Sequence, residues 1–241
     1  AGSGADAIDG GAGVDTVYYD SSTVGVAVNL ANGTALGGDA QGDTLTGVEN
    51  LVGSGFNDTL TGDGGANSLA GGNGDDLLHG GGGADVLTGG NGVDSAEYSG
   101  SAAAVVVNLL TGTGTGGDAQ GDTLTGIENL FGTTFADTLT GNAGVNILGG
   151  GDGDDVLLGG GGADQLRGGN GVDTASYAGS ATAVQVDLSA CTGTGGDAQG
   201  DTLTAIENLI GSSFNDTLIG NAGANDLRGD VGNDVIRGGA R

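Results

Sequence analysis

Apolar residues recur along this chain at a fixed interval of nine. Leu60, Leu69 and Leu78 stand nine residues apart and are separated by glycine, asparagine and aspartate. The repeated unit reads G-G-x-G-x-D-x-U-x, where U is a large aliphatic residue. Its spacing predicts a three-residue strand with one inward side chain and a six-residue turn. Two such units complete one coil, so turns on one side recur every 18 residues.

The inward positions form two matching series. In residues 53–97 they are Leu60, Leu69, Leu78, Leu87 and Ala96, and in the next copy they are Leu139, Leu148, Leu157, Leu166 and Ala175. Between these blocks the nine-residue register is lost. A β-rich run at 102–110 leads to a Gly/Thr loop at 111–117, a turn at 118–122 and short apolar strands at 123–125 and 127–131. We expect wider coils that continue the same core.

A longer repeat contains both parts. Tyr19, Tyr98 and Tyr177 are 79 residues apart, and a Glu-Asn-Leu sequence returns at the same interval at residues 49, 128 and 207. We expect one continuous array over residues 1–241, with units at approximately 1–70, 71–149 and 150–228 and a partial unit at 229–241. The sequence lacks Met and stops inside a nonapeptide, which indicates a fragment of a longer protein. The predicted fold is all-β, a parallel β-roll or β-helix solenoid stabilised by calcium.

Composition explains why a cation is expected. Glycine makes up 59 of 241 residues and aromatic residues only 3%, so the core is thin. The net charge is −27, with carboxylates concentrated at fixed turn positions. We expect disorder without calcium and order with it. The acidic surface disfavours nucleic acid and anionic membranes, and no apolar run approaches the ~20 residues that span a bilayer.

The turns offer the ligands that calcium prefers. Calcium binds about six to eight oxygens, which one turn cannot supply and two stacked turns can. Asp76 and Asp94, 18 residues apart, are expected to face one ion. Backbone carbonyls are expected to complete that shell, from Gly72, Gly74, Gly89 and Asn91.

The same spacing predicts further sites, roughly seven or more Ca²⁺ in all. Pairs with two carboxylates are Asp58 with Asp76, Asp137 with Asp155, Asp155 with Asp173, and Asp216 with Asp234. Pairs with one carboxylate, which should bind more weakly, are Asn67 with Asp85 and Asn146 with Asp164. Asp6 and Asp15 begin the series.

Two alternatives stay open for these aspartates. The carboxylates can instead accept hydrogen bonds within their own turns, although stacked charges without cations would repel each other. Asp118 and Asp122 lie in a segment that resembles a distorted calcium turn, and an Asx turn is an equal alternative for it.

Catalytic chemistry is not expected, and we predict that the chain is not an enzyme. His79 is the single histidine, and Leu158 and Arg237 take its place in other copies. Cys191 is the single cysteine and replaces a glycine of the other copies, which indicates an incidental surface thiol. Zinc sites and Ser-His dyads therefore lack their components.

The nonapeptides resemble the RTX repeats of hemolysin-type secreted bacterial proteins. The resemblance is clearest over 53–97, 132–176 and 211–239, and segments such as 127–141 resemble the spacers of long RTX arrays. It implies export by a type I secretion system, an extracellular or cell-surface location and folding outside the cell. The departures are Asn at positions 67, 146 and 225 and a missing second glycine in the turn at 229–234.

Three functions are compatible with these features. We favour a calcium-binding structural array of a large secreted or surface bacterial protein, such as a stalk, adhesin, surface-layer or filament component. It can alternatively be the non-catalytic tail of a secreted enzyme, or an ice-binding adhesin segment, since Thr59 and Thr61 form an outward pair. Near-identical coils without polar end caps favour end-to-end self-association.

Overall fold

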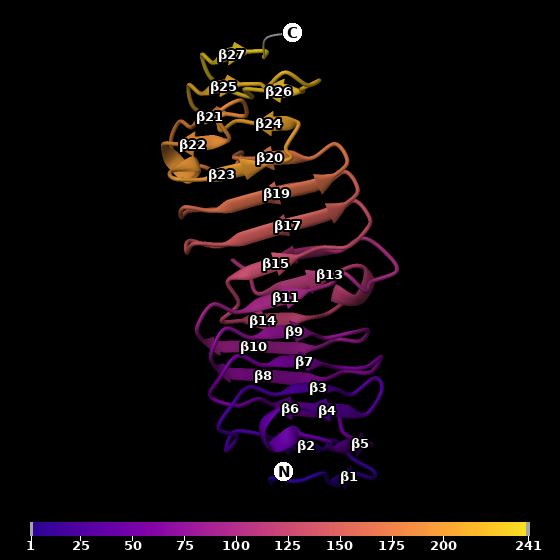
Figure 1. Ribbon diagram of the computed structural model, residues 1–241. Helices are drawn as coiled ribbons and strands as arrows, with labels where there is room; N and C mark the ends of the chain where they lie inside the picture. Colours follow the sequence, from indigo (N-terminus) through magenta and orange to yellow (C-terminus); the bar gives the residue numbers. More distant parts are fainter. Residues whose placement is uncertain (1, 240–241) are drawn as a thin grey trace. The chain divides into compact units, whose positions relative to one another are not determined.

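A computed structural model of the protein describes residues 2–239, and its regular secondary structure consists almost entirely of short β-strands joined by turns (Figure 1). The chain divides into two compact units, one of residues 2–102 and 112–129 and one of residues 103–111 and 130–239. The expected wider coil at 102–131 thus contributes strands to both units.

Strands of the first unit are β1 (Ala7–Asp9), β2 (Thr16–Tyr18), β3 (Ala27–Asn29), β4 (Thr34–Leu36), β5 (Thr44–Thr46), β6 (Asn50–Val52), β7 (Thr59–Thr61), β8 (Ser68–Asn73), β9 (Leu77–His79), β10 (Val86–Asn91), β11 (Ser95–Glu97), β13 (Thr113–Thr115) and β14 (Thr123–Thr125). Strands of the second unit are β12 (Val106–Asn108), β16 (Thr138–Thr140), β17 (Ile147–Asp152), β18 (Val156–Leu158), β19 (Gln165–Asn170), β20 (Thr174–Ser176), β21 (Gln185–Asp187), β22 (Thr192–Thr194), β23 (Thr202–Thr204), β24 (Asn208–Ile210), β25 (Thr217–Ile219), β26 (Leu227–Arg228) and β27 (Val235–Arg237). β15 (Asn129–Phe131) spans the boundary, and three 3₁₀ turns occur at η1 (Gly38–Ala40), η2 (Gly117–Ala119) and η3 (Gly196–Ala198).

Successive nonapeptides of the first unit alternate between two sheets. One has the order β1-β5-β4-β3-β7-β9-β11 and the other β2-β6-β8-β10-β14-β13. Parallel pairing of β7 with β9 places Leu60 beside Leu78. The neighbours in a sheet are therefore two nonapeptides apart, which confirms the predicted two-nonapeptide coil.

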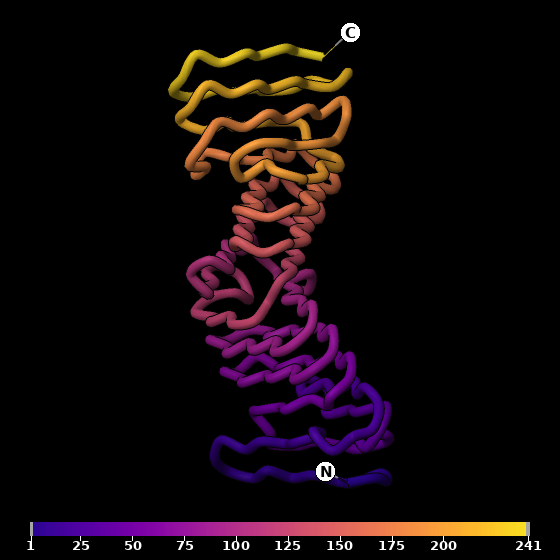
Figure 2. The backbone as a smooth tube through the Cα atoms, turned by 90° about the vertical axis from the view of Figure 1, so that its left-hand side faces the viewer, coloured from indigo at the N-terminus to yellow at the C-terminus, as the bar shows by residue number. Residues whose placement is uncertain are grey.

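The second unit repeats this arrangement. Its sheets have the orders β17-β19-β23-β22-β21-β25-β27 and β12-β16-β18-β20-β24-β26. β17 and β19 pair in parallel, with Leu148 beside Leu166. Figure 2 shows the later part of this unit, coloured from orange to yellow, winding in successive coils.

The core of each unit is formed by two columns of aliphatic side chains, one from each sheet, such as Leu60 with Leu78 and Leu51 with Leu69. All ten predicted inward positions are buried, from Leu60 to Ala96 and from Leu139 to Ala175. Each strand gives one such residue, and its flanking side chains are more exposed in β7 and β9. The period of nine therefore correctly predicted which residues build the core.

The spacer differs from the predicted loop. Residues 113–115 form β13, which pairs antiparallel with β14, and β4 pairs antiparallel with both β3 and β5 in the preceding copy. This strand was not predicted, because its central residue, Gly114, has no apolar side chain to mark an inward position. A Cβ on Gly114 would lie 2.8 Å from the Ala119 carbonyl oxygen, so glycine permits the close approach.

Candidate metal-binding turns

Turn aspartates are joined from coil to coil by a ladder of hydrogen bonds. The backbone N–H of Asp58 donates to Oδ1 of Asp76, and the N–H of Asp76 donates to Oδ1 of Asp94, both at 2.8 Å. Equivalent bonds join Asn67 to Asp85, Asp137 to Asp155, Asp155 to Asp173, Asn146 to Asp164 and Asp216 to Asp234. All of the pairs predicted from the spacing thus lie in adjacent coils.

The second carboxylate oxygen separates the turns into two classes. In seven aspartates Oδ2 is buried and has no hydrogen-bond donor within residues 2–239; these are Asp15, Asp76, Asp85, Asp94, Asp155, Asp164 and Asp173. Asp94 and Asp155 are completely shielded from solvent. A buried carboxylate oxygen without a partner is costly, so each of these oxygens requires a proton or a cation.

The residue four positions earlier decides the class. In every one of the seven turns it is a glycine with a positive φ, for example Gly72 at +116° before Asp76 and Gly90 at +125° before Asp94. In the other class it is not glycine, and its N–H points at the carboxylate. Ser54 N–H thus donates to Oδ2 of Asp58 at 2.5 Å. Where the second glycine of the motif is present, Oδ2 of the aspartate is buried and has no donor in residues 2–239, a state called bare below.

Three predicted ligands belong to the partnered class. Oδ1 of Asp58 accepts hydrogen bonds from the Ser54 hydroxyl at 2.8 Å and from Val26 N–H at 2.7 Å. Oδ2 of Asp137 and of Asp216 accepts the N–H of Thr133 and of Ser212, at 2.5 and 2.6 Å, as Oδ2 of Asp58 accepts that of Ser54. Hydrogen bonding within the turn, left open from the sequence, therefore describes these turns.

The asparagine positions have a role that sequence reasoning missed. Oδ1 of Asn67 accepts the N–H of Asp63, and its Nδ2 donates to the Glu49 carbonyl oxygen, both at 2.8 Å. Nδ2 of Asn225 likewise donates to the Glu207 carbonyl oxygen at 2.7 Å. The spacer coil before these turns presents a carbonyl, which an amide can bond and a carboxylate would repel.

Backbone oxygens lie near the bare carboxylates. A Cβ on Gly89 would lie 2.5 Å from Oδ2 of Asp94, so this carboxylate rests against the first glycine of its turn. The carbonyl oxygens of Gly72 and Gly74 face the next coil, where side chains on Gly90 and Gly92 would collide with them.

Of the other predicted ligands, the Asn91 carbonyl oxygen accepts the N–H of Gly74 at 2.9 Å. Asp6 is exposed, and its N–H donates to Oδ1 of Asp43 at 2.8 Å. Within residues 2–239 no three acidic, histidine or cysteine side chains form a metal-binding group. Any ion here therefore depends on carbonyl oxygens, as calcium permits.

Burial disfavours the charged form of six of the bare carboxylates and raises their pKa values: Asp76, Asp85, Asp94, Asp155, Asp164 and Asp173. Burial, together with the repulsion of nearby carboxylates, raises the pKa of Asp76 to about 6 and that of Asp85 to about 7. Burial also raises the pKa of Asp155 and of Asp164 to about 6. The backbone N–H bonded to each group acts in the opposite direction and is outweighed.

Asp122, undecided from the sequence, has both oxygens partnered. Oδ1 accepts the N–H of Asp85 at 2.9 Å, and Oδ2 accepts the hydroxyl of buried Tyr98 at 3.0 Å. Asp118 lies in η2, and its N–H donates to the Ser101 hydroxyl at 3.0 Å. Tyrosine therefore caps the aspartate column where the chain leaves the nonapeptide register.

The remaining chemically reactive groups lie at the surface. His79 Nε2 is 3.6 Å from an Oε2 of Glu97, and both side chains are about a quarter exposed. Cys191 is exposed and unpaired as a disulfide. In the part of the chain that the structure describes, no helix is long and apolar enough to cross a bilayer.

Comparison with protein families agrees with this geometry. The model of the RTX calcium-binding nonapeptide repeat matches residues 1–22, 43–78, 62–96, 117–157, 146–175 and 206–240, more than half of the chain. No individual curated protein gave a significant match. With nonapeptide turns of this geometry along its length, the chain belongs to the RTX calcium-binding nonapeptide repeat family.

Proposed function

We propose that this chain is a structural scaffold that folds on binding calcium. The observation that carries the proposal is that, within residues 2–239, seven buried Oδ2 atoms have no donor, and each belongs to an aspartate with a positive-φ glycine four positions earlier. Calcium supplies positive charge and accepts mixed carboxylate and carbonyl ligands in flexible geometry. The positive charge would neutralise the bare carboxylate oxygens, and the carbonyl oxygens of the glycine turns would complete the ligand shell.

The direct carboxylate ligands in this proposal are the seven bare aspartates: Asp15, Asp76, Asp85, Asp94, Asp155, Asp164 and Asp173. Asp76 and Asp94 then hold one ion between adjacent turns, with carbonyl oxygens such as those of Gly72 and Gly74. We assign Asp58, Asp137 and Asp216 to turn stabilisation instead, because both carboxylate oxygens of each already accept hydrogen bonds. Asp234 accepts the N–H of Asp216 at 2.9 Å, the bond by which every turn aspartate of the ladder joins the preceding coil.

Metal binding should supply much of the folding free energy. Most strands give the core only one aliphatic side chain, and glycine-rich turns lose much conformational freedom on folding. Stacked carboxylates add repulsion that only a cation or protonation removes. The free energy of calcium binding is therefore available as free energy of folding.

A scaffold in a secreted or cell-surface bacterial protein fits these properties best. Calcium at the ~10⁻⁴–10⁻³ M affinity typical of extracellular modules would be bound outside the cell. A stalk, adhesin, surface-layer or filament segment needs rigidity and repetition, which stacked coils provide. The ice-binding alternative is not favoured, because Thr59 and Thr61 of β7 lie beside Leu77 and His79 of β9 and so form no regular threonine array.

Circular dichroism of the chain with and without calcium tests the proposal. We expect a β spectrum in millimolar calcium, a disordered spectrum after chelation, and recovery when calcium is restored. Magnesium at the same concentration is the control, because it demands octahedral geometry and retains water. A β spectrum that is the same in chelator and in calcium would refute calcium-driven folding.

A further inference from the structure

The spacer glutamates take the place of turn aspartates in the ladder. Oε2 of Glu128 accepts the N–H of Asp94 at 2.8 Å, the bond that Oδ1 of an aspartate accepts elsewhere. Glu49 and Glu207 accept the N–H groups of Asp15 and Asp173 in the same way, at 2.8 and 2.9 Å.

Bare carboxylate oxygens lie at these same junctions. Asp15, Asp94 and Asp173, whose N–H groups the glutamates receive, all have a buried Oδ2 without a donor in residues 2–239. Asp94 and Asp173 are fully shielded from solvent. Each junction thus brings a second carboxylate to an aspartate whose Oδ2 has no donor in residues 2–239.

A backbone carbonyl is directed to the same point. A Cβ on Gly89 would collide with the Gly126 carbonyl oxygen and lie 2.5 Å from Oδ2 of Asp94. In the next copy a Cβ on Gly168 would collide with both the Ala205 carbonyl oxygen and Oδ2 of Asp173. The carbonyl and the bare oxygen therefore meet above the first glycine of the turn.

The backbone keeps this carbonyl in place even without glycine. Gly47 and Gly126 have φ values of +59° and +60°, and Ala205 in the third copy keeps +51°. Alanine rarely adopts this left-handed conformation. Its retention at Ala205 indicates that the surrounding coils fix the direction of the carbonyl.

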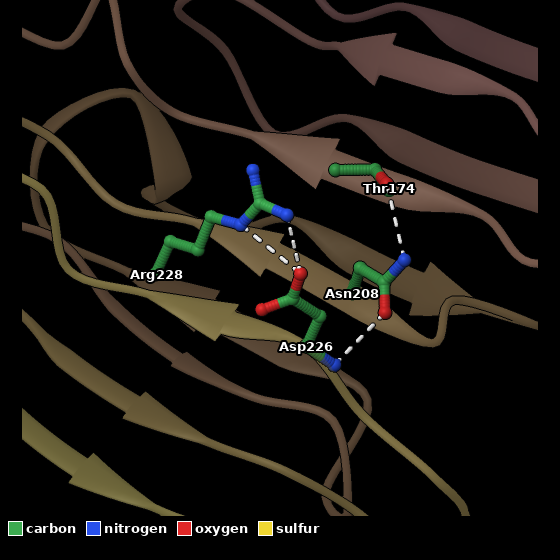
Figure 3. Close-up of polar contacts among 4 residues, drawn as sticks. All are labelled: Thr174, Asn208, Asp226 and Arg228. Carbon is green, nitrogen blue, oxygen red and sulfur yellow. Dashed lines mark hydrogen bonds and ion pairs between the residues drawn. The ribbon is translucent and has the colours of Figure 1, made fainter.

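In the third copy Asn208, which follows the spacer glutamate, bonds to the coil before it and to the coil after it. Nδ2 of Asn208 donates to Oγ1 of Thr174 at 3.4 Å, and its Oδ1 accepts the N–H of Asp226 at 2.9 Å (Figure 3). The N–H groups of Glu207 and Asn208 both donate to the Asp173 carbonyl oxygen. Glu207 is thus positioned by the coil before it and the coil after it.

We propose that each spacer glutamate closes an additional calcium site with the aspartate of the preceding coil: Glu49 with Asp15, Glu128 with Asp94, and Glu207 with Asp173. The ligands are the bare Oδ2, the glutamate carboxylate and the carbonyl oxygen of residue 47, 126 or 205. These sites use a residue outside the nonapeptide motif. The inference rests on the proposed calcium-dependent function and extends it to the spacers.

The alternative is that glutamate acts only as a hydrogen-bond acceptor. Glutamine would accept the same N–H without placing a second negative charge beside a buried carboxylate. Nevertheless, glutamate occupies this position in all three copies, and only one other glutamate, Glu97, occurs in the chain. A charge that is unfavourable without a cation is expected where a cation binds.

Replacing all three glutamates by glutamine separates the two readings. The triple variant E49Q/E128Q/E207Q keeps an acceptor for each N–H, and E97Q is the matched control at an ion pair with His79. Tightly bound calcium is counted by equilibrium dialysis and metal analysis at the lowest concentration that saturates the parent chain. We expect one ion fewer for each replaced junction and no loss in E97Q; an unchanged count in the triple variant would overturn the inference.

A second measurement decides the matter should the triple variant fail to fold. Crystals of the parent chain containing terbium are examined for anomalous scattering. A peak between Asp94 and Glu128 supports the site, and occupied nonapeptide turns with no peak there overturn it. A parent chain that binds no calcium at all would instead contradict the proposed function, so the two failures are distinguishable.

Discussion

The hydroxyl of Tyr98 donates a 3.0 Å hydrogen bond to Oδ2 of Asp122, the oxygen that has no donor in Asp85 one coil earlier. Tyr19 and Asp43 form the same pair at 3.0 Å, and Tyr177 and Asp201 at 2.9 Å. Tyrosine hydroxyls thus satisfy the buried carboxylates at the spacers, and we propose that calcium does so at the nonapeptide turns. Within one column, the group that satisfies Oδ2 of an aspartate therefore depends on the residues beside it.

Removing one hydroxyl should be costly even in saturating calcium. Tyr98→Phe leaves Oδ2 of buried Asp122 without its donor, and a lost bond to a buried charged group costs about 1–3 kcal/mol. We expect the urea midpoint of the calcium-bound chain to fall accordingly. Tyr18→Phe is the control, because the Tyr18 residue is 53% exposed; equal midpoints for the two variants would count against the capping role.

The two classes of aspartate should respond differently to the same substitution. Asp155→Asn keeps an acceptor for Asp137 N–H but replaces a bare carboxylate oxygen, so we expect the loss of one tightly bound ion. Asp137→Asn should destabilise its turn, since Oδ2 there accepts Thr133 N–H, while the ion count stays constant. Calorimetric titration of both variants tests this, and an equal loss of ions would show that the classes are not distinct.

A partnered turn should be convertible into a calcium turn. The double variant Ser54→Gly, Phe56→Gly gives residues 53–58 the glycines of a nonapeptide turn and removes the side chains that prevent a positive φ. Oδ2 of Asp58 should then become bare, and we expect one additional bound ion. Ser54→Ala is the control because it removes the hydroxyl and keeps the N–H; a double variant with the parent's ion count would contradict the rule.

The sequence predicted the stack better than the chemistry of each turn. The leucine period located Leu60 and Leu78 correctly, because a residue's position in a nonapeptide fixes which way it points. The state of each carboxylate depends instead on φ at the residue four positions earlier and on what the previous coil presents. A count of carboxylates therefore treated Asp58 and Asp76 as equivalent calcium ligands. In the structure Oδ2 of Asp58 accepts the Ser54 N–H, whereas Oδ2 of Asp76 has no donor in residues 2–239. The rule can be read from sequence only once the role of the second glycine is known.

Acidity should act in opposite directions on the metal-free and calcium-bound chain. Burial raises the pKa of Asp76, Asp155 and Asp164 to about 6 and that of Asp85 to about 7, from an ordinary 3.8. A carboxyl with a raised pKa in the folded state contributes stability that is complete below about pH 4 and is lost as the pH rises through about 6 to 7. Each such group corresponds to a change on the order of 3 kcal/mol.

The metal-free chain should therefore gain β structure when the pH falls from 8 to 5, because protonation removes the buried charges and much of the net charge of −27. Calcium affinity should fall over the same range, since calcium requires the ionised carboxylates. Circular dichroism of chain freed of metal by dialysis, recorded at both pH values, checks the first effect, and calorimetric titration checks the second. A metal-free chain that loses β structure on acidification would show that these carboxylates are not buried and bare in the folded state.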